Sequence, residues 1–291
     1  MRFTAFIGAL TSLALVLSPI SAAHADGTAF PGTRALGTGG AMRAAATGDS
    51  GPLLNPSGIS FVHSYTAESS YTYGSRDSTQ DARLAVVDST SGSNLGGALF
   101  YTYHRASPAA GSQTGHLGGL CLSFPLGEVV LLGGTAKYLH LSGGGTDTKK
   151  EFSFDAGVTV RAGQVLSVAV VGYNLNNPGT AFAPLALGGG VSVSPMPGLL
   201  LLADGVVERV YADETRNKAY YVMGGGEYLA NMVAIRLGGG RDGLHRNGYL
   251  SGGLSAVSTV GAVDLSMRQD ISGDRKATIV GLTARLFVPN N

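Results

Sequence analysis

The chain has 291 residues, with 20 Lys and Arg against 19 Asp and Glu, and charged residues make up 13% of it, about half the usual share of a globular domain. Without residues 1–25, which hold Arg2 and no acid, the balance is 19 against 19, and this zero net charge gives no support for nucleic-acid binding. Cys121 is the only cysteine, so the chain has no disulfide framework or cysteine metal site, and we expect Cys121 to be a small apolar filler.

Residues 1–25 predict a signal peptide. Arg2 precedes an apolar run from Ala5 to Leu17, and Ala23-His24-Ala25 supplies the small residues of a cleavage site. We therefore expect cleavage after Ala25 and export of the remaining chain. No later segment has the ~20 uncharged apolar residues that a membrane helix needs.

Residues 26–58 form a segment of a different kind, which we call the hatch segment. Its alanine-rich stretch from Ala41 to Thr47 predicts one or two helical turns. The following Gly48-Asp49-Ser50-Gly51 predicts their end.

Residues 59–291 repeat apolar side chains at alternate positions, interrupted by turns. Long polar turns alternate with tight ones. The long turns are 74–81, 105–114, 143–149, 176–184, 212–216, 241–247 and 271–275; the tight ones are 125–127, 162–163, 195–197, 230–231 and 258–259. The turn 89–94 belongs by its place to the tight series but is longer than that series predicts. This pattern predicts an all-β fold, an up-and-down antiparallel transmembrane β-barrel of about 14 strands, with the long turns facing outward. Twelve or sixteen strands also fit, because strand ends read from sequence err by ~2–4 residues.

The two faces of the strands differ in polarity. In 151–161, Phe152, Phe154 and Val158 share one face, while Asp155 and Arg161 share the other. A charge facing lipid costs up to ~2–4 kcal/mol near the middle of the bilayer, so we expect the charged faces to line the lumen. The predicted lumen charges are Asp155, Arg161, Asp204, Glu208, Glu227, Arg236, Asp264, Arg268 and Arg285.

Two interpretations of these charges remain open: an ion-pair network that holds the hatch segment, and a set of groups that governs passage of a solute. Two strands, 164–172 and 198–203, are apolar on both faces. They indicate a part of the lumen that is plugged by protein or is itself apolar.

Tyrosines near strand ends fit an aromatic girdle at the membrane interface. They are Tyr73, Tyr101, Tyr138, Tyr173, Tyr211, Tyr220, Tyr228 and Tyr249. The histidines are scattered over different strands and turns without the spacing of metal ligands. The sequence therefore predicts no catalytic residues, no metal site and no cofactor.

The hatch segment carries a specific resemblance. Arg34, Ala35, Leu36, Gly37, Gly39, Gly40 and Ala41, followed by Asn55-Pro56-Ser57-Gly58, resemble the N-terminal signature of the FadL/PorV-type outer-membrane barrels, which include long-chain fatty-acid transporters and PorV/PorQ-like proteins. Gly226-Glu227-Tyr228 and the run from Ala234 to Gly238 resemble a strand pair of the PorV-like branch, and Asn174-Leu175 resembles the start of another of its motifs. Gly48-Asp49 stands where these relatives have an acidic pair.

The resemblance implies a fourteen-stranded barrel whose lumen is filled by the hatch segment. It assigns the hatch motif to Arg34, Gly37, Gly39, Gly40, Asn55 and Pro56, and it implies a non-enzymatic outer-membrane protein. We expect passage of a small hydrophobic solute, gated by the hatch. The alternatives are a PorV-like structural or docking component of an envelope or secretion assembly without transport activity, and a soluble extracellular all-β protein.

Overall fold

The structure is a computed structural model of the chain, and it describes residues 32–90, 95–107, 111–144, 146–178, 183–210, 217–273 and 276–288. The predicted signal peptide and Tyr211 lie outside these ranges. None of the helices in the described ranges is long and apolar enough to cross a membrane.

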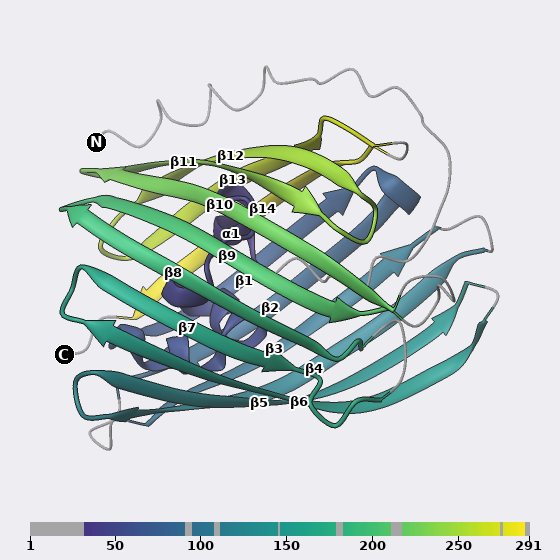
Figure 1. The fold of residues 1–291 in the computed structure, drawn as a ribbon, viewed down its shortest axis with the longest axis horizontal. Coiled ribbons are helices and arrows are strands. Elements are labelled where there is room, and N and C mark those ends of the chain that lie inside the picture. The colour runs from purple at the N-terminus through teal and green to yellow at the C-terminus, as the bar shows by residue number, and fades with distance from the viewer. Residues whose placement is uncertain are drawn as a thin grey trace.

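The described residues form a closed barrel of 14 antiparallel strands, in which each strand pairs with its neighbours in sequence and β1 pairs with β14. The predicted fold class and strand number are therefore confirmed (Figure 1). The strands are β1 (Tyr65–Gly74), β2 (Thr79–Asp88), β3 (Gly96–Ala106), β4 (Gln113–Leu126), β5 (Val130–Gly143), β6 (Thr146–Ala162), β7 (Leu166–Tyr173), β8 (Ala186–Met196), β9 (Leu199–Arg209), β10 (Lys218–Ala230), β11 (Val233–Asp242), β12 (Asn247–Val257), β13 (Gly261–Asp270) and β14 (Thr278–Val288).

The pleat explains why alternate residues occupy opposite faces of this wall. In β6, Phe152, Phe154 and Val158 are exposed on the outside, whereas Asp155 and Thr159 are buried inside. In β11, β13 and β14, too, apolar side chains are exposed on the outside and polar ones are buried inside, the opposite of a soluble protein. Tyr101, Tyr138, Tyr220 and Tyr228 point outward as predicted.

Two tyrosines of the predicted girdle point into the barrel. Tyr249 is buried and its hydroxyl donates to Gly39 O at 2.8 Å. Tyr173 bonds the hatch in the same way, because its hydroxyl donates to Leu54 O at 2.5 Å. For these two residues the girdle prediction is wrong: a buried phenol needs a hydrogen-bond partner, and the hatch supplies it.

One long turn was also predicted wrongly. Instead of a connection over 143–149, β5 runs to Gly143 and β6 begins at Thr146. Gly143 and Gly144 both have positive φ, 85° and 69°, which permits a hairpin tighter than other residues allow.

The hatch, defined from here on as residues 32–61, lies inside the barrel (Figure 1). It consists of short pieces: α1 (Thr33–Gly37), η1 (Arg43–Ala45), η2 (Gly48–Ser50), α2 (Gly51–Leu54) and η3 (Pro56–Phe61). A further short helix, η4 (Arg76–Ser78), joins β1 to β2. The alanine-rich stretch forms one of the one or two predicted helical turns, η1, whereas Gly48-Asp49-Ser50, predicted only to end them, forms a short turn of its own, η2.

The first strand begins at Tyr65 rather than at residue 59. Asn55 caps η3 by accepting the backbone N–H of Ser57, and the apolar side chain of Ile59 is buried with Val87, Ala98 and Cys121. Residues up to Phe61 are thus held in the lumen. Cys121 is buried in this cluster, as the sequence predicts.

Candidate functional site: the hatch and the cavity beside it

The glycine motif of the hatch allows it to lie directly against the wall. Gly39 has φ 73°, and a Cβ at this position would lie 2.7 Å from Gly239 N and 2.9 Å from Gly224 O. Such distances are well inside van der Waals contact, so only glycine fits. Gly238 of the second motif, in β11, also lies against this part of the hatch, because a Cβ there would be 2.5 Å from Gly39 N.

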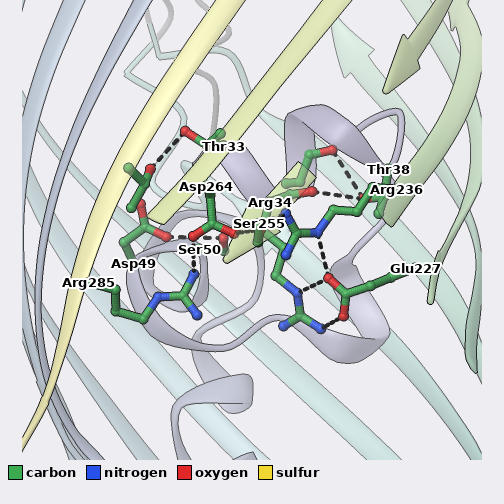
Figure 2. A network of polar contacts seen from close by, with 12 residues as sticks. Thr33, Arg34, Thr38, Asp49, Ser50, Glu227, Arg236, Ser255, Asp264 and Arg285 are labelled. Atoms are coloured by element: carbon green, nitrogen blue, oxygen red, sulfur yellow. Dashed lines mark hydrogen bonds and ion pairs between the residues drawn. The ribbon is translucent and has the colours of Figure 1, made fainter. Parts of the chain in front are cut away.

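Arg34 of α1 makes the central polar contact between hatch and wall. Its Nε and Nη2 donate to the two carboxylate oxygens of Glu227 at 2.8 and 2.6 Å, and its Nη1 donates to Thr47 Oγ1 at 3.0 Å. Arg236 Nε also donates to Glu227, at 2.5 Å. Figure 2 shows Glu227 between the two guanidinium groups. A bidentate pair of this kind is among the stronger polar contacts in proteins.

The network continues across the neighbouring strands. Arg236 Nη1 lies 2.9 Å from Asp264 Oδ1, and Arg285 Nη2 lies 3.3 Å from Asp264 Oδ2. Arg285 Nε lies 3.1 Å from Glu68, whose other oxygen accepts the backbone N–H of Asp49 at 3.0 Å. The network thus begins at Arg34 and returns through Glu68 to the hatch at Asp49; Figure 2 shows its part from Arg34 to Arg285.

Asp49 is the acidic residue of the hatch in this network. Burial raises the pKa of its carboxyl above the usual range, and the charge of Asp264 adds to this, although Arg83 and Arg285 act in the opposite direction. At Asp49 the hatch therefore contacts the wall through its backbone N–H, while the carboxyl, whose ionisation burial disfavours, accepts from Ser50 Oγ within the hatch.

A second polar contact holds the middle of the hatch. Arg43 donates to Asp204 Oδ2 both from its backbone N, at 2.9 Å, and from Nη1, at 3.0 Å. Its Nε donates to the hydroxyl of Tyr173 at 2.8 Å, and that hydroxyl donates to Leu54 O. Arg43 and Tyr173 were not predicted as a pair; only the closed barrel places β7 beside the hatch.

Asn55 and Pro56 form the third contact. Asn55 is fully buried, and its Nδ2 donates to Arg43 O at 2.7 Å and to Thr159 Oγ1 at 2.8 Å. Its Oδ1 accepts the N–H and the hydroxyl of Ser57. One side chain thus joins η3, η1 and the wall strand β6.

The remaining predicted lumen charges lie in separate places. Asp155 pairs with Lys137 at 2.7 Å, and the guanidinium of Arg161 lies 4.5 Å above the ring of Phe61. Arg268 pairs with Asp242 and Asp270 and stacks on Tyr249, 3.7 Å from its ring centroid. Glu208 lines the cavity described next.

A cavity of about 310 Å³ lies between the hatch and the barrel end that carries the long connections. Apolar side chains of the hatch and of the wall line it, together with polar groups nearer the connections. The hatch contributes Leu36, Gly39, Gly40, Arg43, Leu53 and Leu54; the apolar wall residues include Leu117, Leu139, Leu141, Val206, Met223 and Ile279; the polar ones include Asp81, His104, Gln113 and Arg76. His104 Nδ1 lies 2.7 Å from Asp81 Oδ1. The cavity can therefore hold an apolar body with a polar rim around it.

In the parts of the chain that the structure describes, no group of three or more His, Cys, Asp or Glu residues has the geometry to hold a metal ion. His104, His116 and His140 occupy neighbouring strands, but His104 faces inward while the other two face outward.

Sequence reasoning missed Glu68 and Arg83. Both lie on strands whose outward positions include polar or small residues, such as Ser69 and Ala82, so the inward face was not distinguishable by polarity. Their burial follows from the closed wall and the hatch.

No protein-family profile matches the chain, and no curated protein matches it. Solved structures do. A FadL homologue of Pseudomonas aeruginosa is similar with a TM-score of 0.65 and 11% identity, over 88% of this chain and 98% of that one. The Pseudomonas putida toluene transporter TodX gives 0.67 and 9%, over 88% and 96%. The monoaromatic hydrocarbon channel CymD gives 0.63 and 11%, over 88% and 98%. The chain has the fold of these channels, a 14-stranded barrel with its N-terminal segment in the lumen.

Proposed function

We propose that this chain is an outer-membrane channel for a small hydrophobic solute and that the hatch gates its path. The observation that carries the proposal is the cavity of about 310 Å³, whose floor is the hatch and whose walls carry leucines of β4 and β5. This volume is at the lower end of the range for small-molecule pockets, which favours a solute of about one ring.

The structural neighbours support the same class of solute. Their names describe a toluene transporter and a monoaromatic hydrocarbon channel. Identities of 9 and 11% to these two proteins indicate a shared fold but not a shared specificity. Our proposal for the solute class is therefore based on the apolar cavity of this chain.

The contacts of the hatch define what gating requires. Arg34, Arg43 and Asn55 each join the hatch to a different part of the wall. A solute that leaves the cavity toward the short-turn end has to pass the hatch. We therefore expect the hatch, or one part of it, to move during passage.

Two disulfide locks test this movement. The hydroxyls of Thr33 and Thr283 lie 2.7 Å apart, and those of Ser57 and Thr159 lie 2.8 Å apart, so paired cysteines at either position can form a bond with little backbone movement. We expect Thr33→Cys/Thr283→Cys or Ser57→Cys/Thr159→Cys, when oxidised, to lower uptake of labelled toluene by Gram-negative cells to the level of cells without the protein. Reduction should restore uptake.

The four single-cysteine variants are the matched controls, because each carries the substitution and the native Cys121 but cannot form the lock. Full uptake through both oxidised locks would exclude gating by the hatch. Absence of uptake through the unaltered chain would exclude transport of this solute.

The dense polar contacts of the hatch favour a second candidate, a structural or docking component of an envelope or secretion assembly. A hatch held from Arg34 to Asn55 resembles a permanent plug. In that case both locked variants would retain full function in the assembly, and no solute would cross.

A further inference from the structure

The outer surface of β3 to β6 has rows of side chains set by strand register. Cross-strand pairing aligns Tyr101, Gly118, Tyr138 and Phe152 in one row. The next row toward the long connections holds Tyr103, His116, His140 and Lys150. Arg105 lies in the row after that and is exposed. An aromatic row is thus followed directly by a basic one.

The histidines of the basic row have defined positions. Tyr101 Oη and His116 Nδ1 are hydrogen-bonded at 2.6 Å. The rings of His116 and His140 stack with centroids 6.1 Å apart and an angle of 25° between their planes. Lys150 pairs with His140 in register, and neither Lys150 nor Arg105 has an acidic partner among the described residues.

A second basic group occupies the outer surface of β9 to β11. Arg209 and Lys218 are in register with one another, and Arg241 is exposed on the adjacent strand. Tyr220, which is 62% exposed, lies two positions from Lys218 on the same face. This group repeats the order of the first one, with basic residues beyond an outward tyrosine.

Exposed acids are found at the opposite end of the barrel. Among the described side chains of the wall, Asp88 and Glu128 are exposed at the end that carries the tight turns. Arg105, Lys150, Arg209, Lys218 and Arg241 are exposed at the end that carries the long connections. Among the described residues, exposed basic side chains therefore gather at the end with the long connections and exposed acidic ones at the opposite end.

We propose that two groups of basic side chains bind the phosphate groups of a phosphorylated glycolipid in the outer leaflet around the barrel. The first group is Arg105 and Lys150 on β3 and β6, and the second is Arg209, Lys218 and Arg241 on β9 to β11. Aromatic rings mark the membrane interface, and the basic side chains lie directly beyond them, at the depth of lipid phosphates. Arg and Lys bind phosphate through charge-assisted hydrogen bonds. This inference rests on the outer-membrane location and is independent of transport.

The test compares diphosphoryl lipid A with its dephosphorylated form, using the full chain in detergent micelles. We expect the unaltered chain to bind the diphosphoryl form more tightly. Arg105→Gln/Lys150→Gln should weaken that binding by roughly tenfold or more, since each basic group near a lipid surface contributes on the order of 1 kcal/mol. Arg209→Gln/Lys218→Gln should act in the same direction, and neither double variant should change binding of the dephosphorylated form.

Arg246→Gln/Lys276→Gln is the matched control. This variant also removes one Arg and one Lys charge, but from exposed positions in the connections, and it should leave the binding of lipid A unchanged. Equal binding of both lipid A forms by the unaltered chain would overturn the proposal, as would an equal loss in the control variant. Heat-modifiable migration on a gel checks that each variant is folded, so a barrel that fails to form is distinguished from one that forms without binding lipid A.

Discussion

At the scale of single residues, two motifs distant in sequence meet at one carboxylate. Arg34 comes from the hatch, Glu227 from β10 and Arg236 from β11. Each belongs to one of the two stretches that carry the sequence resemblance to FadL/PorV-type barrels. Their ion pairs supply a physical reason for these residue types: a carboxylate that is largely removed from water needs cationic partners.

We expect Arg34→Gln to destabilise the folded chain by about 1–3 kcal/mol, because it removes a two-bond ion pair but leaves Glu227 with Arg236 as a partner. Denaturant titration in detergent micelles measures this change in the free energy of unfolding. Lys276→Gln, an exposed change in the β13–β14 connection, is the control and should have no effect. If Arg34→Gln and the control unfold at the same denaturant concentration, the ion pair of Arg34 with Glu227 contributes nothing to stability.

At the scale of elements, the hatch is made of short helices that have little stability of their own. It is held by what it contacts. Its apolar residues Ala35, Met42 and Leu54 pack with Leu202 of β9. This contact explains why 198–203 is apolar on both faces: one face is exposed outside the wall and the other packs on the hatch.

Asn55 is the side chain that joins two pieces of the hatch to the wall, so its loss should release η3. Asn55→Ala removes the buried hydrogen bonds to Arg43 O and Thr159 Oγ1 and the cap of η3 at Ser57 N. We expect it to lower the free energy of unfolding by about 2–4 kcal/mol. We expect faster hydrogen exchange of amides 57–61 with little change in β10 or β14.

Asn176→Ala is the comparison, because Asn176 also hydrogen-bonds a residue of β6, at Phe152 O, but is exposed. If amides 57–61 exchange no faster in Asn55→Ala than in Asn176→Ala, the hatch is held by its other contacts.

At the scale of the whole molecule, the wall has apolar side chains outside and polar ones inside, and this arrangement predicts how charge tolerance depends on depth. Leu282 lies near the middle of β14, and Leu286 lies near its end; both are exposed outside. In lipid vesicles, we expect Leu282→Arg to lower folding stability by about 2–4 kcal/mol and Leu286→Arg by about 0–1 kcal/mol.

Measurement of folding free energies in vesicles and in a water-soluble amphipol would check this difference. A soluble extracellular all-β protein, the third alternative from the sequence, would tolerate both arginines equally, since both sites would already face water.

Local patterns in the sequence predict an all-β barrel of about 14 strands and the faces of most of those strands, but they leave twelve or sixteen strands open. Period-two alternation and turn spacing are local properties, and an outward charge is costly at any strand in a membrane. Alternation in β6, β11, β13 and β14 was therefore readable without tertiary information.

The tertiary structure decided which inward groups meet and where the hatch ends. Glu68 joins the ion-pair network although β1 alternates weakly, Tyr173 and Tyr249 turn inward to bond the hatch, and η3 extends beyond residue 58. Each outcome depends on a contact between segments far apart in the chain. Such contacts exist only once closure between β1 and β14 has formed the lumen, because closure brings the hatch within hydrogen-bond distance of strands far from it in sequence.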